Sequence, residues 1–173
     1  MITTRDARWA QWHLSRLGEG GGASAIVFNL TVIACAVCLT IIASYLYGER
    51  ARTVPLGRAE VVRTLLYVVA ICWIGIGMFP FDGHPIVHNI FGYGEFIVLG
   101  VLIAGMRYWS PNLTRRTYWL GYIGVCVAVL MMIGFHVTHF TSLLSIELIG
   151  EAFFIGWLLS VTYDSGRMAP KTT

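Results

Sequence analysis

Five long apolar blocks follow one another along the chain, and short polar stretches separate them. A bilayer core about 30 Å thick is crossed by about 20 helical residues, and each block is long enough to do so. The sequence therefore predicts an all-α fold, a polytopic transmembrane bundle of five helices. The predicted helices are roughly Ala25–Tyr47, Val61–Phe79, Pro85–Met106, Thr117–His139 and Ser142–Tyr163.

Composition agrees with this pattern. Of the 173 residues, 57% are hydrophobic and 12% are charged, about half the charged share of ordinary soluble chains. The net charge of +3 is spread between the apolar blocks rather than gathered in a patch, so no nucleic-acid partner is expected. We expect a multi-pass protein of the plasma (cytoplasmic) membrane. Its expected partners are membrane lipids, and a second membrane protein or self-association stays open.

The basic residues predict an orientation. Lys and Arg occur in the first and third connections and in the C-terminal tail, whereas the second and fourth connections have none. The positive-inside rule then places the basic connections and the C-terminus in the cytoplasm and the N-terminus outside. Residues 1–24 would form an extracytoplasmic segment along the membrane surface, 25–163 the transmembrane domain and 164–173 a cytoplasmic tail. Three arginines before the first helix run against this assignment.

Most intramembrane His and carboxylate residues fall in the predicted outer half of the bundle. Glu95 follows His88 by seven residues and lies on nearly the same helix face. Glu147 and Glu151 are one turn apart on the last helix. The rise of about 1.5 Å per residue brings Glu151 to the depth of Glu95. The full set of candidate pocket residues is Asp82, His84, His88, Glu95, His136, His139, Glu147 and Glu151.

Such residues are costly in a membrane, which is why they suggest a site. A charged side chain at the bilayer centre costs about 2.5–3.5 kcal/mol, so these carboxylates should face the bundle interior. We expect Glu95 and Glu151 to share a proton. An outward-facing pocket of this kind would bind a polar ligand, either a lipid headgroup or a divalent metal.

Two chemistries remain open for the pocket. His88, His136 and His139 are candidate ligands for a metal such as Zn²⁺. In hydrolysis of a lipid headgroup, Glu95 or Glu151 would be the catalytic base. Haem is disfavoured because His88 and His136 would lie near the surface.

Two non-catalytic interpretations compete with this pocket. In an accessory or assembly subunit of a membrane complex, the polar residues would serve helix–helix hydrogen bonds. Proton or ion conduction would need polar residues through the whole thickness, and the predicted cytoplasmic half has almost none. Conduction is therefore ranked low.

Four short stretches carry a family resemblance. They are Leu14-Ser15-Arg16-Leu17-Gly18 with the following Ser24–Asn29, then Gly75–Asp82, then His88-Asn89, and finally Glu147 with Trp157, where Leu148 replaces an expected Arg. On these residues the chain resembles the membrane protein family called domain of unknown function 998, which is similar to the DRAM-like (damage-regulated autophagy modulator) group.

The resemblance has structural implications but names no reaction. It implies a helical bundle whose S-x-L-G, F-P-x-D and H-N elements gather on the outer face. The family usually has one more helix before the S-x-L-G loop, and we expect that helix to be missing here. Its absence would account for the arginines stranded before the first predicted span.

Overall fold

The computed structural model describes residues 13–168, and these are helical almost throughout. Five of the helices are long and apolar enough to cross a membrane, and no strand occurs in the described part of the chain. This confirms the predicted all-α class and the number of spans. The elements are the 3₁₀ helix η2 (Leu14–Gly18), α1 (Ala23–Arg50), α2 (Leu56–Met78), α3 (Pro85–Trp109), α4 (Arg115–Ile133), the π-helical turn η3 (Gly134–Thr138) and α5 (Leu143–Met168).

Several helices extend beyond the predicted apolar blocks. Helix α1 runs on to Arg50, α2 begins at Leu56, and α5 continues to Met168. Hydropathy marks only the part of a helix inside hydrocarbon, whereas the backbone hydrogen bonds continue through the interface. The predicted tail 164–173 therefore begins within α5, and its residues 169–173 lie outside the described part.

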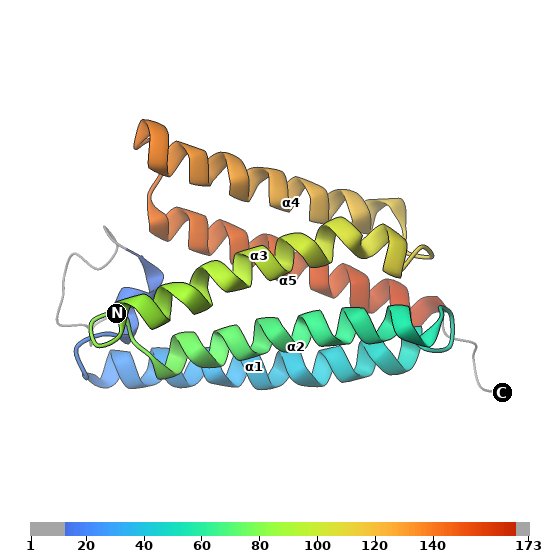
Figure 1. Ribbon diagram of the computed structural model, residues 1–173, viewed down its shortest axis with the longest axis horizontal. Coiled ribbons are helices and arrows are strands. Elements are labelled where there is room, and N and C mark those ends of the chain that lie inside the picture. Colours follow the sequence, from blue (N-terminus) through green and yellow to red (C-terminus); the bar gives the residue numbers. More distant parts are fainter. Residues whose placement is uncertain (1–12, 169–173) are drawn as a thin grey trace.

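The helices form a bundle in which α1 and α2 pair as an antiparallel hairpin and α3 crosses them obliquely (Figure 1). Glycines allow the closest approaches. A Cβ on Gly77 of α2 would lie 2.9 Å from the Asn29 carbonyl oxygen of α1, and one on Gly121 of α4 would lie 2.8 Å from Trp157 Nε1 of α5. Small residues of this kind let membrane helices pack backbone to side chain.

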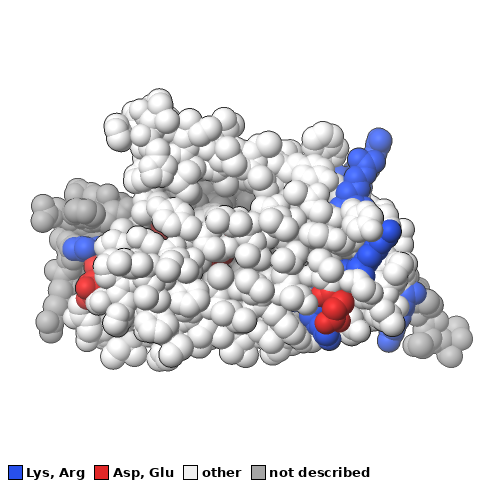
Figure 2. All heavy atoms as spheres, in the orientation of Figure 1, with Lys and Arg blue, Asp and Glu red and all other residues white. Residues whose placement is uncertain are grey.

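Charge separates the two ends of the bundle. One end, here called the basic end, holds the start of α2, the start of α4 and the C-termini of α1, α3 and α5. Most Lys and Arg side chains visible in Figure 2 gather there. Its arginines are Arg50, Arg52, Arg58, Arg63, Arg107, Arg115, Arg116 and Arg167. The opposite end, which carries the described histidines, is the histidine end. Which end faces the cytoplasm stays a prediction.

Helix α4 packs least closely against the rest. In the most apolar stretch of the span Arg115–Thr138, which is α4 with η3, only 11% of the residues are buried. The corresponding share in α2 is 39%. The space-filling view shows the surface hollowed between α4, at the top, and the helices below it (Figure 2). The loose packing of α4 therefore leaves room for a cavity within the bundle.

Candidate functional site

Two carboxyl groups meet inside the bundle, one from α3 and one from α5. Glu95 is 3% exposed, and its side chain is hydrogen-bonded to that of Glu151. Because an ionised carboxylate only accepts hydrogen bonds, such a contact is what the predicted shared proton would produce, and the shared proton itself stays a prediction. The Trp73 indole N–H of α2 donates to Glu95 Oε1 as well. Three helices are thus joined through one carboxyl group.

The third carboxylate, Glu147, joins α5 to the segment before the first span. The Leu14 backbone N–H, at the start of η2, donates to Glu147 Oε2. Glu147 and Glu151 are one turn apart, so the same face of α5 serves both contacts. The carboxylates therefore form a line that runs from the histidine end toward the middle of the bundle.

A chain of hydrogen bonds connects two histidines through a serine. His88 Nδ1 lies 2.9 Å from the Phe79 carbonyl oxygen and His88 Nε2 lies 3.2 Å from Ser15 Oγ. The carbonyl only accepts, so Nδ1 donates to it, and the Ser15 hydroxyl is the partner of Nε2. His13 Nδ1 lies 2.8 Å from the same hydroxyl oxygen. All three polar side chains are buried.

His13 lies before the first span and titrates unusually. Burial, followed by the nearby His88 and Arg16, lowers the pKa of His13 below its ordinary value of 6.5. The Glu19 carboxylate is 3.7 Å from His13 Nε2 and would oppose this shift, but Arg16 Nη1 lies closer to that carboxylate, at 3.0 Å. The effect of burial therefore outweighs the attraction of the Glu19 carboxylate, and the neutral form of His13 is favoured.

Asp82 and His84 serve the loop after α2. Asp82 Oδ2 accepts from the Gly20 backbone N–H at 3.0 Å, and Gly20 has a positive φ of 75°. The exposed His84 ring rests edge-on against Phe79. The Asp82 contact anchors the chain between η2 and α1 to the loop between α2 and α3.

The remaining predicted histidines lie elsewhere. His136 and His139 are both exposed, one within η3 and the other directly after it. The wide π-helical turn ends at His139 in a left-handed conformation, φ 55°. Within residues 13–168 no group of three or more His, Cys, Asp or Glu side chains is placed to hold a metal ion. The proposed set of His88, His136 and His139 thus finds no support as a metal site.

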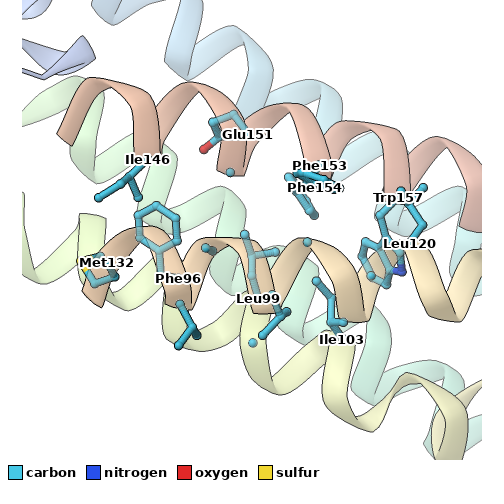
Figure 3. Close-up of a pocket in the computed structure, with 17 residues that line it drawn as sticks. Phe96, Leu99, Ile103, Leu120, Met132, Ile146, Glu151, Phe153, Phe154 and Trp157 are labelled. Carbon is cyan, nitrogen blue, oxygen red and sulfur yellow. The ribbon is translucent and has the colours of Figure 1, made fainter. Parts of the chain in front are cut away.

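An apolar cavity of about 230 Å³ adjoins the carboxyl pair. It lies between α3, α4 and α5, is partly open, and has Glu151 as its only ionisable lining residue. Figure 3 shows Glu151 on α5, beside the apolar side chains that line the space between the helices. The other labelled lining residues are Phe96, Leu99, Ile103, Leu120, Met132, Ile146, Phe153, Phe154 and Trp157. We call this cavity the Glu151 groove.

Comparison with protein families identifies the relatives of this chain. Residues 2–164 match the family described as "Protein of unknown function (DUF998)". The chain belongs to this family. No curated protein and no solved structure matches it.

The stretches that carry the resemblance to DUF998 meet at the histidine end. Ser15 of the S-x-L-G stretch contacts His88 of the H-N pair, and His88 in turn contacts the Phe79 carbonyl of the F-P-x-D stretch. Gly18 accepts from Asn29 Nδ2 at 3.1 Å, and a Cβ at Gly18 would lie 2.4 Å from Asn29 Oδ1. The expected gathering of these elements is confirmed, at one end of the bundle.

Sequence reasoning missed three partners in this DUF998 protein. His13, Ser15 and Trp73 supply hydrogen bonds that the carboxylates and His88 need. The indole of Trp73 counts as apolar in a hydropathy pattern, although its N–H is a donor. The only available signal for Ser15 was its place in the S-x-L-G stretch.

The basic half has buried polar residues of its own. Several polar side chains are buried at the basic end, outside or at the edge of the predicted spans: Arg50, Ser110, Thr117, Asp164 and Ser165. The buried apolar core between the helices includes Leu99, Leu102 and Leu158. The protein thus has a polar cluster in each half.

Proposed function

We propose that this protein binds a membrane lipid, or a similar amphiphile, in the Glu151 groove. The observation that carries the proposal is the combination of a 230 Å³ apolar cavity with one carboxyl group in its wall. Ligand sites commonly pair a mostly apolar surface with a few polar groups that fix orientation. The apolar part of the ligand would lie along α3 and α5, and its polar group would reach Glu151.

The lining limits the chemistry of the ligand. Only one side chain in the groove can make a charge-assisted hydrogen bond, so one donor group on the ligand suffices. Glu151 is the ninth residue of α5, which places it about 12 Å along the helix from its start at 1.5 Å per residue. A bulky charged headgroup at that depth would be desolvated at high cost. The ligand we propose is therefore a long-chain alcohol rather than a lipid with a charged headgroup.

The carboxyl pair supports binding more than hydrolysis. Glu95 is occupied by Trp73 and by Glu151, so a free general base is not its role in this arrangement. The shared proton expected for the pair would let Glu151 accept a ligand hydroxyl without a full buried charge. Its neighbour Glu147 is held by the Leu14 amide.

Photolabelling tests the proposal directly. The probe is a photoreactive, clickable hexadecanol, with the matching alkane as its control, added to the full-length protein in nanodiscs. We expect crosslinks on α3, α4 and α5 within the groove. The alcohol should label about tenfold more than the alkane, the equivalent of one hydrogen bond of about 1.4 kcal/mol. In Glu151→Leu this preference should disappear.

Two glycines of α3 offer a matched pair of variants. Gly100 lines the groove and Gly92 does not, yet a Cβ at either position meets nothing within 4 Å. Gly100→Leu should fill the groove and remove most labelling, whereas Gly92→Leu should leave it unchanged. Equal labelling of both variants, or crosslinks spread evenly over the helices, would contradict the proposal.

A helix from a second membrane protein is the competing occupant. The low burial of α4 favours it, because a partner could pack between α3 and α4. An accessory-subunit role predicts that Gly100→Leu breaks a stable complex with a copurifying membrane protein while alcohol labelling is absent from the wild type. That outcome would replace lipid binding by subunit assembly.

A further inference from the structure

A buried arginine at the basic end has donors with no acceptor. Arg50, the last residue of α1, is 1% exposed. Its Nη1 donates to Ser165 Oγ at 3.0 Å, but its Nε and Nη2 have no hydrogen-bond partner in the described part of the chain. No carboxylate among residues 13–168 forms an ion pair with it. A buried charge without a partner costs several kcal/mol.

The two unpartnered nitrogens are the pair that suits an oxyanion. The N–H bonds of Nε and Nη2 lie parallel on one edge of the planar guanidinium group, and such a fork matches two oxygens of a phosphate or carboxylate. At the same end of the bundle, Ser110 is 0% exposed and its hydroxyl has no partner among the described residues. Tyr118 donates to the Ser110 carbonyl and is within electrostatic range of Arg50.

The acid next to Ser165 in the sequence binds the start of α4 rather than Arg50. Asp164 precedes Ser165, but its Oδ2 already accepts from the Thr114 backbone N–H at 3.0 Å, the Thr114 hydroxyl at 2.9 Å and the Thr117 hydroxyl at 2.6 Å. That carboxylate instead caps the start of α4.

Other arginines of the basic end have protein partners. Arg52 pairs with Glu49 at 3.6 Å, and Arg58 lies 4.3 Å from the ring centre of Tyr108. Arg50 is buried far more completely than either of them. Its unmatched fork therefore sets it apart from these neighbours.

We propose that Arg50, with Ser110 and Ser165, binds a phosphate-type oxyanion, supplied by a phospholipid headgroup or by free phosphate. A tetrahedral anion offers two oxygens to the guanidinium fork and further oxygens to the hydroxyl groups. Basic pockets between membrane helices are a recurring way to hold lipid phosphates. None of these three residues lines the Glu151 groove, so the two proposals stand or fall separately.

Two loops meet beside the end of α1, where Arg50 lies. Thr53, in the α1–α2 loop, donates from its backbone N–H to the Arg50 carbonyl at 2.8 Å. Asn112, in the α3–α4 loop, reaches the Thr53 carbonyl through a long hydrogen bond of 3.4 Å. These two loops are joined by this weak contact beside the end of α1.

The first experiment follows free phosphate. Full-length protein in detergent, stripped of lipid, is titrated with inorganic phosphate at constant ionic strength, with chloride as the reference anion. We expect saturable broadening of the ³¹P signal and a phosphate-specific rise in melting temperature. Arg50→Lys keeps the charge but loses the fork, so its phosphate affinity should fall at least tenfold. Arg52→Lys, an exposed neighbour, should bind as the wild type does.

The second experiment follows lipid. Native mass spectrometry of gently purified protein should show a retained phospholipid that is lost in Arg50→Lys and kept in Arg52→Lys. That result assigns the headgroup as the source, whereas a phosphate response without a retained lipid assigns free phosphate. If Arg50→Lys does not fold, Ser110→Ala removes one donor and takes its place. A wild type that shows neither response, or variants that match it in both, would overturn the proposal.

Discussion

The two polar clusters of this protein have opposite imbalances of hydrogen-bonding groups. The cluster toward the histidine end has a surplus of acceptors, because three glutamates enter the bundle from α3 and α5. Each finds a partner within the chain: Glu95 takes the Trp73 indole and Glu151, and Glu147 takes the Leu14 amide. That cluster is internally satisfied.

The basic end has a surplus of donors instead. Arg50 has one partner, Ser165, and two nitrogens without any in the described chain, and the buried Ser110 hydroxyl also lacks one. The difference follows from acid–base chemistry. A carboxyl group can take up a proton and become a donor, whereas a guanidinium group does not lose its proton in proteins. An excess of carboxylates can be resolved internally, but a buried arginine needs an acceptor from elsewhere.

The largest expected effect tests the satisfied cluster. Glu95→Leu would leave the Trp73 N–H and the Glu151 carboxyl group buried without their partner, and should lower the free energy of unfolding by about 3 kcal/mol. Glu95→Gln keeps polar contacts at the same position and should cost less than half as much. Unfolding of the detergent-solubilised protein by SDS titration measures both. Equal losses in the two variants would show that Glu95 acts through its volume alone.

A smaller effect is expected at the basic end. Ser165→Ala removes the only hydrogen-bond partner that the Arg50 side chain has within residues 13–168, and should cost about 2 kcal/mol, the range for hydrogen bonds to charged groups. Ser160, on the same helix, donates only to the Gly156 carbonyl one turn back, at 3.0 Å, and provides the control. Ser160→Ala should change the same SDS unfolding curve by under 0.5 kcal/mol. If both variants behave alike, Ser165 contributes nothing specific to holding Arg50.

The smallest effect depends on pH. Because the pKa of His13 is lowered in the folded protein, the unfolded state binds a proton that the folded state resists. Its contribution to stability is therefore full above about pH 6.5 and is lost as the pH falls below that value. The loss should not exceed about 1.4 kcal/mol per pH unit.

Variants isolate the contribution of His13. His13→Gln should flatten the dependence of stability between pH 6.5 and 5, whereas the exposed His136→Gln should not. An unchanged slope in His13→Gln would show that another group controls it. The charged or titratable groups around His13 are Arg16 and Glu19 on its own segment, His88 on α3, Glu147 on α5, bound to the adjacent Leu14, and Asp82, bound to Gly20.

The sequence predicted the helices well because hydrocarbon thickness imposes a clear length on each apolar block. It also predicted that Glu95 and Glu151 lie at one depth, since helical rise fixes the axial position of a residue. Rotation about the helix axis is not fixed in this way. His136 and His139 were expected to face the site, but the π-helical turn η3 carries them at the exposed end of α4.

The groove and the buried arginine lay beyond sequence reasoning for a different reason. A cavity depends on how closely whole helices pack, and α4 is looser than its composition reveals. An arginine beside a predicted span is normally assigned to the interface. The extension of α1 to Arg50 as a regular helix places its side chain inside the bundle.

The short helix η2 has a consequence for how the protein is assembled. It precedes α1 in the chain, yet Leu14 binds Glu147 of α5 and Ser15 binds His88 of α3. During synthesis this segment emerges before the five spans, but its last partner emerges more than a hundred residues later. We expect η2 to dock only after α5 has inserted, so a segment made before every span would be among the last to reach its final place.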